Sequence, residues 1–277
     1  MRILTLNTHS YMEDNFESKY NTLIECLKKE EFDIIAFQEV NQLEKSRIVN
    51  QTLNHYYVSS NQSIDIKIDN FALKVINSLS EQNLNYYWTY LPMHIGYDKF
   101  DEGVALLSKY PIEDTNIILL SQNDNYRNYK NRKTLGIKVN GVWYYSIHLG
   151  WWNDAEDPMQ AQINTLISKI DMSSTVFLMG DFNCPAEKKD EGYDYILNNF
   201  PFYDTHKLAK KSHGNYTIVN TIDGWNSTKK EKLRIDLILK NNNLPIDESN
   251  VIFDGTSYDI VSDHFGLSIV NKKETVL

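Results

Sequence analysis

The sequence predicts a layered α/β sandwich, in which packed β-sheets carry helices on their outer faces. Many short strand-like runs are separated by only a few helical segments, and each helical segment has one apolar face. This pattern favours packed sheets over a single doubly wound sheet. No Pro/Gly/Ser-rich linker and no internal repeat divides the 277 residues, 42% of which are hydrophobic. We therefore expect one domain, residues 1–277, with a large core.

The helices are predicted from apolar residues that recur at helical spacing. They lie at about 17–30, at about 67–84, from Asp157-Pro158 to Ile170, and near 190–199. We expect Asp157 to cap the third helix, with Pro158 in its first turn.

The strands are predicted from short apolar runs bounded by turn residues. They lie at 2–7, 33–38, 86–91, 103–108, 116–120, 134–139, 142–149, 175–180, 234–239, 251–253 and 266–270. Asn140-Gly141 is a typical two-residue hairpin turn between two of these strands.

The charge balance argues against a nucleic-acid partner. Lys and Arg number 28 and Asp and Glu 37, a formal charge of −9. A protein that binds a polyphosphate backbone usually presents a basic face, because neutralised phosphates release counterions. Part of the acidic excess could surround a cation, although solubility alone also explains it.

The N-terminus and the cysteines bear on the cellular compartment. The chain enters a strand pattern at Arg2 with no apolar signal-peptide core, and no apolar run is long enough to span a bilayer. Cys26 and Cys184 form no CxxC pair, so neither a zinc site nor a disulfide framework is indicated. We expect a cytoplasmic protein without a membrane partner.

Polar and ionisable side chains gather at or near the ends of the predicted strands. They are Asn7, Glu39, Glu102, His148, Asp181, Asn183, Asp236, Asp263 and His264. Each alone also fits a plainer role, such as a turn, a cap or a packed histidine. Asp236 is harder to explain in that way, because a charge between Ile235 and Leu237 must be paired if it is buried.

As a set, these residues supply what hydrolysis of a phosphate ester needs. Oxygen ligands such as those of Glu39, Asn7 and Asp263 suit a hard cation. Imidazoles such as those of His264 and His148 suit proton transfer near neutral pH. Carboxylates such as Asp236 and Glu102 could orient those imidazoles.

Seven motifs follow one another along the chain. They are Leu6-Asn7, Gln38-Glu39, 102–112 (EGVALLSKYPI), His148, Gly180-Asp181-Phe182-Asn183, Arg234-Ile235-Asp236 and Ser262-Asp263-His264. In this order they resemble the motifs of the endonuclease/exonuclease/phosphatase superfamily, which includes pancreatic deoxyribonuclease and inositol polyphosphate phosphatases. The resemblance implies a deoxyribonuclease-like, four-layer α/β/β/α sandwich with the site at one edge.

The resemblance also implies roles for the metal and the water. Glu39 would be the principal ligand of Mg²⁺ or Mn²⁺, supported by Asn7 and Asp263. Asp181 would position or activate the attacking water, and Asn183 would donate to a phosphate oxygen.

Two carboxylate–imidazole pairs are implied in the same way. His264 would face the scissile phosphate with Asp236 behind it. Glu102 and His148 resemble the second pair of the deoxyribonuclease branch. The resemblance leaves open which of Asp181 and His264 is the general base.

Loop motifs narrow the substrate. Residues 6–10, 95–103, 148–154 and 222–225 are similar to a bacterial branch that includes maltose 6'-phosphate phosphatases. This similarity implies a phosphorylated sugar as the substrate. The alternatives are a nuclease of the same fold and a non-catalytic binding module, and the second is disfavoured because no motif position is lost.

Five residues are candidates for binding that substrate. They are Trp151, Trp152, Arg132, Asn153 and His9. One indole should reach the rim of the site and stack on a sugar ring, while the other packs beneath the loop. Arg132 could reach the phosphate or be an ordinary loop charge. His9, like His94, fits a place at the rim.

Overall fold

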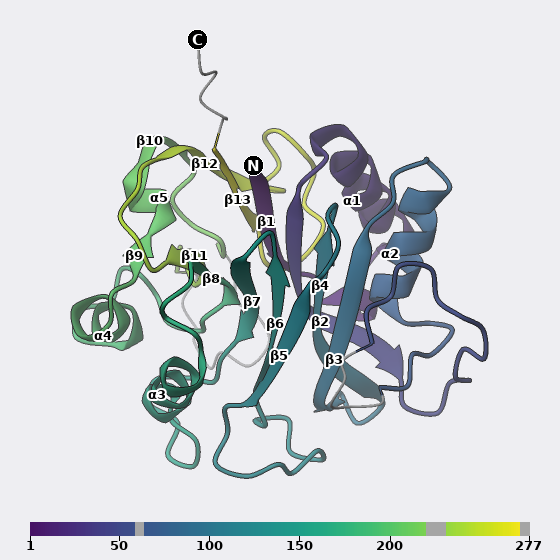
Figure 1. Ribbon diagram of the computed structural model, residues 1–277, viewed down its shortest axis with the longest axis horizontal. Helices are drawn as coiled ribbons and strands as arrows, with labels where there is room; N and C mark the ends of the chain where they lie inside the picture. Colours follow the sequence, from purple (N-terminus) through teal and green to yellow (C-terminus); the bar gives the residue numbers. More distant parts are fainter. Residues whose placement is uncertain (59–63, 220–230, 272–277) are drawn as a thin grey trace.

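Two β-sheets pack face to face in the computed structural model, which describes residues 1–58, 64–219 and 231–271. Helices cover the two outer faces, so that Figure 1 shows four layers: helices, sheet, sheet and helices. This arrangement confirms the predicted α/β/β/α sandwich.

Among the described residues, the first sheet has seven strands in the order β10-β12-β13-β1-β2-β4-β3. Their bounds are β1 Arg2–Asn7, β2 Ile34–Leu43, β3 Tyr87–Gly96, β4 Phe100–Ser108, β10 Ala209–His213, β12 Ile246–Ile252 and β13 Gly266–Val270. The parallel pair β1 and β2 lies near the middle of the sheet.

The second sheet, over the same described ranges, has six strands in the order β5-β6-β7-β8-β11-β9. Their bounds are β5 Asp114–Leu119, β6 Lys133–Val139, β7 Val142–His148, β8 Val176–Asp181, β9 Tyr203–Asp204 and β11 Asp236–Lys240. β7 and β8 are parallel, so their carboxyl ends lie side by side. The Asn140-Gly141 hairpin is confirmed, with φ of 50° and 75° as its turn type requires.

Apolar side chains fill the three spaces between the four layers. α1 (Phe16–Glu30) and α2 (Phe71–Ser80) pack on the first sheet, and α3 (Met159–Lys169) and α4 (Gly192–Asn199) pack on the second (Figure 1). A middle layer, which includes Ala36, Leu106, Ile137 and Met179, lies between the sheets. A single turn, η1 (Ser10–Met12), follows β1, and the short α5 (Thr205–Leu208) follows β9.

Several element boundaries differ from the prediction. The helix expected over 67–84 is shorter, because Asn70 caps it by accepting a hydrogen bond from Leu73 N at 3.0 Å. Asp157 does not cap α3: its carboxylate accepts from Gln162 Nε2 at 2.9 Å, and Pro158 holds the cap position. β2 continues past residue 38 through an irregularity to Leu43.

No helix in the described part of the chain is long and apolar enough to cross a bilayer.

Candidate active site

The strand-end residues from both sheets meet at one place. β1 ends in Asn7, β7 in His148 and β8 in Asp181, and β11 begins at Asp236 opposite Asp181. A pocket of about 290 Å³ opens there. Nine predicted residues line it: Glu39, Glu102, Arg132, His148, Trp151, Asp181, Asn183, Asp263 and His264. A larger hollow, about 600 Å³, lies between residues 47–55 and α2, and no predicted site residue lines it.

Gly180 permits the close approach of β7 and β8 that places His148 beside Asp181. Its φ is +148°, and a Cβ at this position would lie 1.9 Å from the carbonyl oxygen of Ile147. Only glycine fits a backbone in that conformation and at that distance. The glycine of the Gly-Asp-Phe-Asn motif is therefore required by the packing of β8 against β7.

Glu39 lies at an irregularity in β2 that turns it toward the pocket. The register with β4 shifts between Phe37 and Val40, and Glu39 has a left-handed φ of 51°. Asn7 Nδ2 donates to Glu39 Oε1 at 2.8 Å and to Asp181 Oδ2 at 3.2 Å, which links the two sheets. Burial, together with the nearby carboxylates of Glu102 and Asp263, raises the pKa of Glu39 to about 8.

His264 and Asp236 form the predicted pair. His264 Nδ1 lies 2.9 Å from Asp236 Oδ2 and 3.2 Å from Oδ1, and Asp236 is fully buried. Burial lowers the pKa of His264, but the Asp236 and Asp181 carboxylates outweigh it and raise that pKa well above its usual range. The ring is therefore an imidazolium whose Nε2 lies 3.9 Å from Asp181 Oδ2. Burial raises the pKa of Asp181 to about 6, although His264 opposes that rise.

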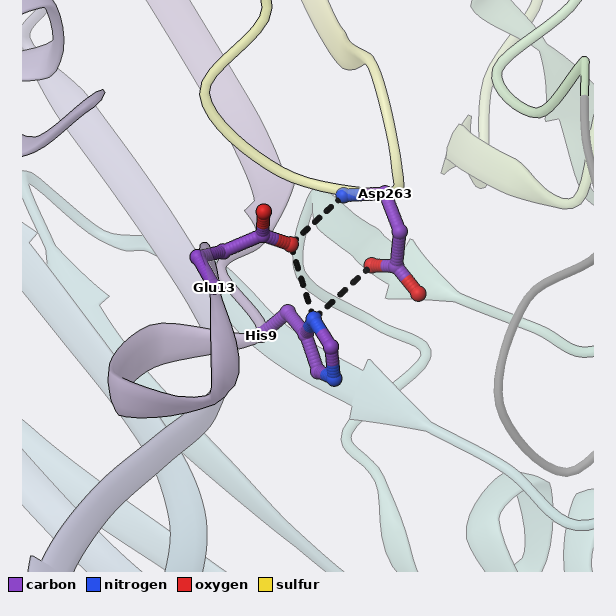
Figure 2. A group of neighbouring side chains, drawn as sticks. All are labelled: His9, Glu13 and Asp263. Atoms are coloured by element: carbon purple, nitrogen blue, oxygen red, sulfur yellow. Dashed lines mark hydrogen bonds and ion pairs between the residues drawn. The ribbon is translucent and has the colours of Figure 1, made fainter. Parts of the chain in front are cut away.

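His9 joins two carboxylates beside Glu39. Figure 2 shows its Nδ1 between Glu13 and Asp263, with Glu13 Oε1 at 2.7 Å and Asp263 Oδ1 at 3.7 Å. Glu13 Oε1 also accepts a hydrogen bond from Asp263 N at 2.9 Å. Burial lowers the pKa of His9, but Glu13, Asp263 and Glu39 together raise it to about 9. The sequence analysis placed His9 at the rim and missed Glu13, which reaches the site from the turn after η1.

Glu102 pairs with His94 and not with His148, so the expected second pair is wrong. His94 and Glu102 are cross-strand partners on β3 and β4, and His94 Nε2 lies 3.0 Å from Glu102 Oε1. His94 Nδ1 faces the carbonyl oxygen of Asn131 at 2.9 Å. His94 therefore links Glu102 to the loop between β5 and β6 that carries Arg132.

His148 has no carboxylate behind it. Its Nε2 lies 3.8 Å from Asp181 Oδ2 and 4.0 Å from Glu39 Oε1, and its Nδ1 has no hydrogen-bond partner among the described residues. Burial and the positive charges of Arg132 and His94 hold the pKa of His148 well below its usual range. His148 is therefore a neutral imidazole.

The family model for the endonuclease/exonuclease/phosphatase family matches residues 4–264. The chain belongs to this family. It is therefore a hydrolase of the phosphatase and nuclease class. Among curated proteins no match is found.

Solved structures from several organisms share the fold. A family protein from Leptotrichia buccalis C-1013-b is 31% identical, with a TM-score of 0.86 over 98% of this chain and 99% of that one. A mannosyl-6-phosphatase from Bacteroides thetaiotaomicron VPI-5482 is 15% identical, with a TM-score of 0.59 over 98% of each chain. An AP endonuclease from Archaeoglobus fulgidus is 17% identical, also with a TM-score of 0.59 over 98% of each chain.

The candidate substrate residues of this family member divide between pocket and loop. Arg132 is 3% exposed, and its guanidinium carbon lies 5.9 Å from the centre of the Trp151 ring, which lines the pocket. Trp152 instead packs on Tyr195, with ring centres 5.6 Å apart. Asn153 is exposed and does not line the pocket. The motif at 222–225 lies outside the described residues.

Arg132, His148 and Trp151 each bury a polar atom that has no partner in the described chain. These atoms are Arg132 Nε, His148 Nδ1 and Trp151 Nε1. A buried polar group without a hydrogen bond costs roughly 1–3 kcal/mol, and folded proteins contain few of them. Their concentration around one pocket is typical of a site that binds a ligand or ordered water.

Proposed function

We propose that this protein is a divalent-metal-dependent phosphomonoesterase that releases phosphate from a small sugar phosphate, such as maltose 6'-phosphate. One observation carries the proposal: the pocket has an acidic wall and a cationic wall. Glu39 and Asp263 make up the acidic wall, and the buried Arg132 guanidinium, with His94 Nδ1 3.4 Å from its Nη1, makes up the cationic wall. Such a pocket can hold a cation and a phosphate dianion side by side.

The residues present fit a hard cation. The pKa of Glu39 is raised to about 8 by burial and the nearby carboxylates even though His9 opposes the rise, so a further positive charge would stabilise this acidic wall. Glu39 and Asp263 would hold Mg²⁺ or Mn²⁺, which would polarise a phosphoryl oxygen. As placed, Asn7 turns its Nδ2 toward Glu39, while its Oδ1 accepts from His9 N at 3.2 Å. Asn7 would therefore orient the carboxylates unless its amide turns over.

The protonation states favour one division of the chemistry. His264 is an imidazolium held by Asp236, so it is suited to donate a hydrogen bond from Nε2 to the phosphoryl group. Asp181, with its pKa raised by burial to about 6, is largely ionised near neutral pH and can accept the proton of the attacking water. Asn183 N donates to Asp181 Oδ1 at 2.8 Å and fixes that carboxylate.

Two lysines that follow pocket residues in the chain, Lys130 and Lys133, are already paired, which disfavours a polyanionic substrate. Lys130 Nζ lies 2.9 Å from Asp154 and 3.6 Å from Glu156, and Lys133 Nζ lies 2.7 Å from Asp124. These carboxylates cancel the charges that would otherwise bind a second and third phosphate. The pocket volume, about 290 Å³, is also at the low end of small-molecule sites of roughly 300–1,000 Å³. The name mannosyl-6-phosphatase on a structure of the same fold supports a sugar ester.

The experiment is a phosphate-release screen with Mg²⁺ over sugar phosphates, nucleotides and plasmid DNA, at 50 and 200 mM NaCl. We expect release from a hexose or disaccharide 6-phosphate with weak dependence on salt, and little DNA cleavage. Trp151→Ala should raise the KM for that substrate. A nuclease that contacts 6–10 phosphates would lose about 10³–10⁵ in affinity over this range. Salt-sensitive DNA cleavage without release from sugar phosphates would therefore refute the proposal.

We also propose a cytoplasmic location. Cys26 and Cys184 are both buried, free thiols. Unpaired cysteines are usual in a reducing compartment, where disulfides are rare.

A further inference from the structure

Two exposed tyrosines stand at the mouth of the pocket. Tyr97 is 37% exposed and Tyr129 is 56% exposed, and both are among the residues that line the pocket. They come from different segments, since Tyr97 lies in the turn between β3 and β4 and Tyr129 lies between β5 and β6. Large aromatic side chains exposed at the edge of a polar pocket are typical of a surface that binds a ligand.

The backbone at Tyr97 is fixed by the turn and by the acidic wall. Tyr97 and Asp98 both have left-handed φ values, 51° and 55°, in a tight hairpin turn. The Tyr97 hydroxyl lies 3.1 Å from His9 Nε2, and His9 is held in turn by Glu13 (Figure 2). The Tyr97 hydroxyl is thus tied, through His9, to Glu13 and Asp263.

The backbone at Tyr129 is fixed by the cationic wall. Arg132 Nη1 donates to the Tyr129 carbonyl oxygen at 2.7 Å. Asn131 Nδ2 donates to Met93 O at 3.0 Å, which ties this loop to β3. The ring of Tyr129 is exposed while its main chain is anchored. A surface that is already ordered loses little conformational entropy when it binds a ligand.

We propose that Tyr97 and Tyr129 form a subsite that holds the sugar ring of a hexose phosphate whose phosphate lies between Arg132 and Glu39. The inference rests on the proposed function and adds a binding site for the sugar ring, which the phosphate-binding residues do not contact. Aromatic faces contact the C–H faces of a pyranose ring. The four carboxylates that line the pocket, Glu39, Glu102, Asp181 and Asp263, disfavour a ligand with a second phosphate and can accept hydrogen bonds from neutral hydroxyls.

The test separates the contribution of the sugar ring to binding from that of the phosphate. Tyr129→Ala and Tyr97→Ala are compared for the KM of glucose 6-phosphate and for the inhibition constant of inorganic phosphate. We expect each variant to raise the KM about tenfold, a loss of about 1.4 kcal/mol, and to change phosphate inhibition less than twofold. Tyr203→Ala is the matched control, because Tyr203 is 40% exposed on β9 and does not line the pocket. Tyr97→Phe separates the ring from its hydroxyl bond to His9 and should retain most of the affinity.

A second measurement does not depend on catalysis. In EDTA, saturation-transfer NMR should show contact between the wild-type protein and the ring protons of glucose 6-phosphate, and both alanine variants should lose it. Equal changes in KM and in phosphate inhibition would overturn the subsite. Adenosine monophosphate binding more tightly than the hexose ester through the same tyrosines would also overturn it. Ring contact that needs both tyrosines, with no phosphate released from any monoester, would refute the proposed function and leave the subsite standing.

Discussion

Replacing Glu39 by glutamine should make the metal-free protein more stable above about pH 8, although it removes the proposed metal ligand. The Glu39 carboxyl is 17% exposed, and its pKa is raised from 4.5 to about 8 by burial and by Glu102 and Asp263. A carboxyl with a raised pKa binds its proton more tightly in the folded state. The folded state therefore loses stability as the pH rises from about 4.5 to about 8. Glutamine is neutral at every pH and does not incur this loss.

The size of the effect follows from that pKa. The difference between 4.5 and about 8 is about 3.5 pH units, and each unit corresponds to about 1.4 kcal/mol, so the upper bound is about 5 kcal/mol. The effect should be smaller than this bound, because the repulsion is shared among Glu39, Glu102 and Asp263 and because solvent reaches part of the Glu39 side chain. We therefore expect Glu39→Gln to add about 2–4 kcal/mol to the free energy of unfolding at pH 8.5. At pH 5 the difference should fall below about 1 kcal/mol.

The assay is urea denaturation in EDTA at both pH values, repeated with saturating Mg²⁺. Wild-type protein should gain about 2.7 kcal/mol at a metal concentration of 100 times the dissociation constant, and Glu39→Gln should gain nothing. Glu25→Gln is the control, because Glu25 is exposed on α1. A Glu39→Gln protein that is less stable than wild type at pH 8.5 in EDTA would refute the reasoning, as would a difference that is the same at pH 5.

Two further predictions concern the buried pairs. His264→Ala and Asp236→Ala should each lower kcat by about 10²–10⁴, and the double variant should be little worse than the poorer single variant, because the two side chains act as a unit. Losses that multiply, measured in the same kinetic assay, would show that they act independently. Glu102→Gln should cost about 3–5 kcal/mol of stability in urea, because it leaves the buried Arg132 guanidinium and the His94 ring without the carboxylate that stabilises them. A cost below about 1 kcal/mol would show that Glu102 does not balance them.

Regular, strongly patterned elements could be predicted from the sequence. The strands at 2–7 and 266–270 agree with β1 and β13 at both ends, because each is a short, mainly apolar run that ends at or next to an asparagine. β10 (Ala209–His213) was missed because its residues, Ala-Lys-Lys-Ser-His, are almost all exposed and carry no alternation. Its pairing with β12 is a tertiary contact that no local pattern reports.

The partners within the site were harder to predict than its members. The motif order brings seven residues to one pocket, but it does not say which imidazole faces which carboxylate. A hairpin centred on Asp98 places residues 94 and 102 opposite each other, so the pairing of His94 with Glu102 was accessible from the turn. The placement of Glu13 was not, because Glu13 reaches Asp263 only after the chain has folded.

The irregularity in β2 interrupts the regular ladder of the sheet and thereby directs the Glu39 side chain into the pocket. Phe37 and Val40, three residues apart, both pack into the layer between the first sheet and its helices, whereas an uninterrupted strand would give that face to Glu39. Deleting Gln38 would restore the ladder and relieve the left-handed conformation of Glu39. The chain could then keep its sandwich while losing the carboxylate from the pocket. The number of residues in β2, as well as their identity, therefore decides whether the fold contains the site. A sequence alignment that allows a gap at this position would match proteins that have the site with proteins that lack it.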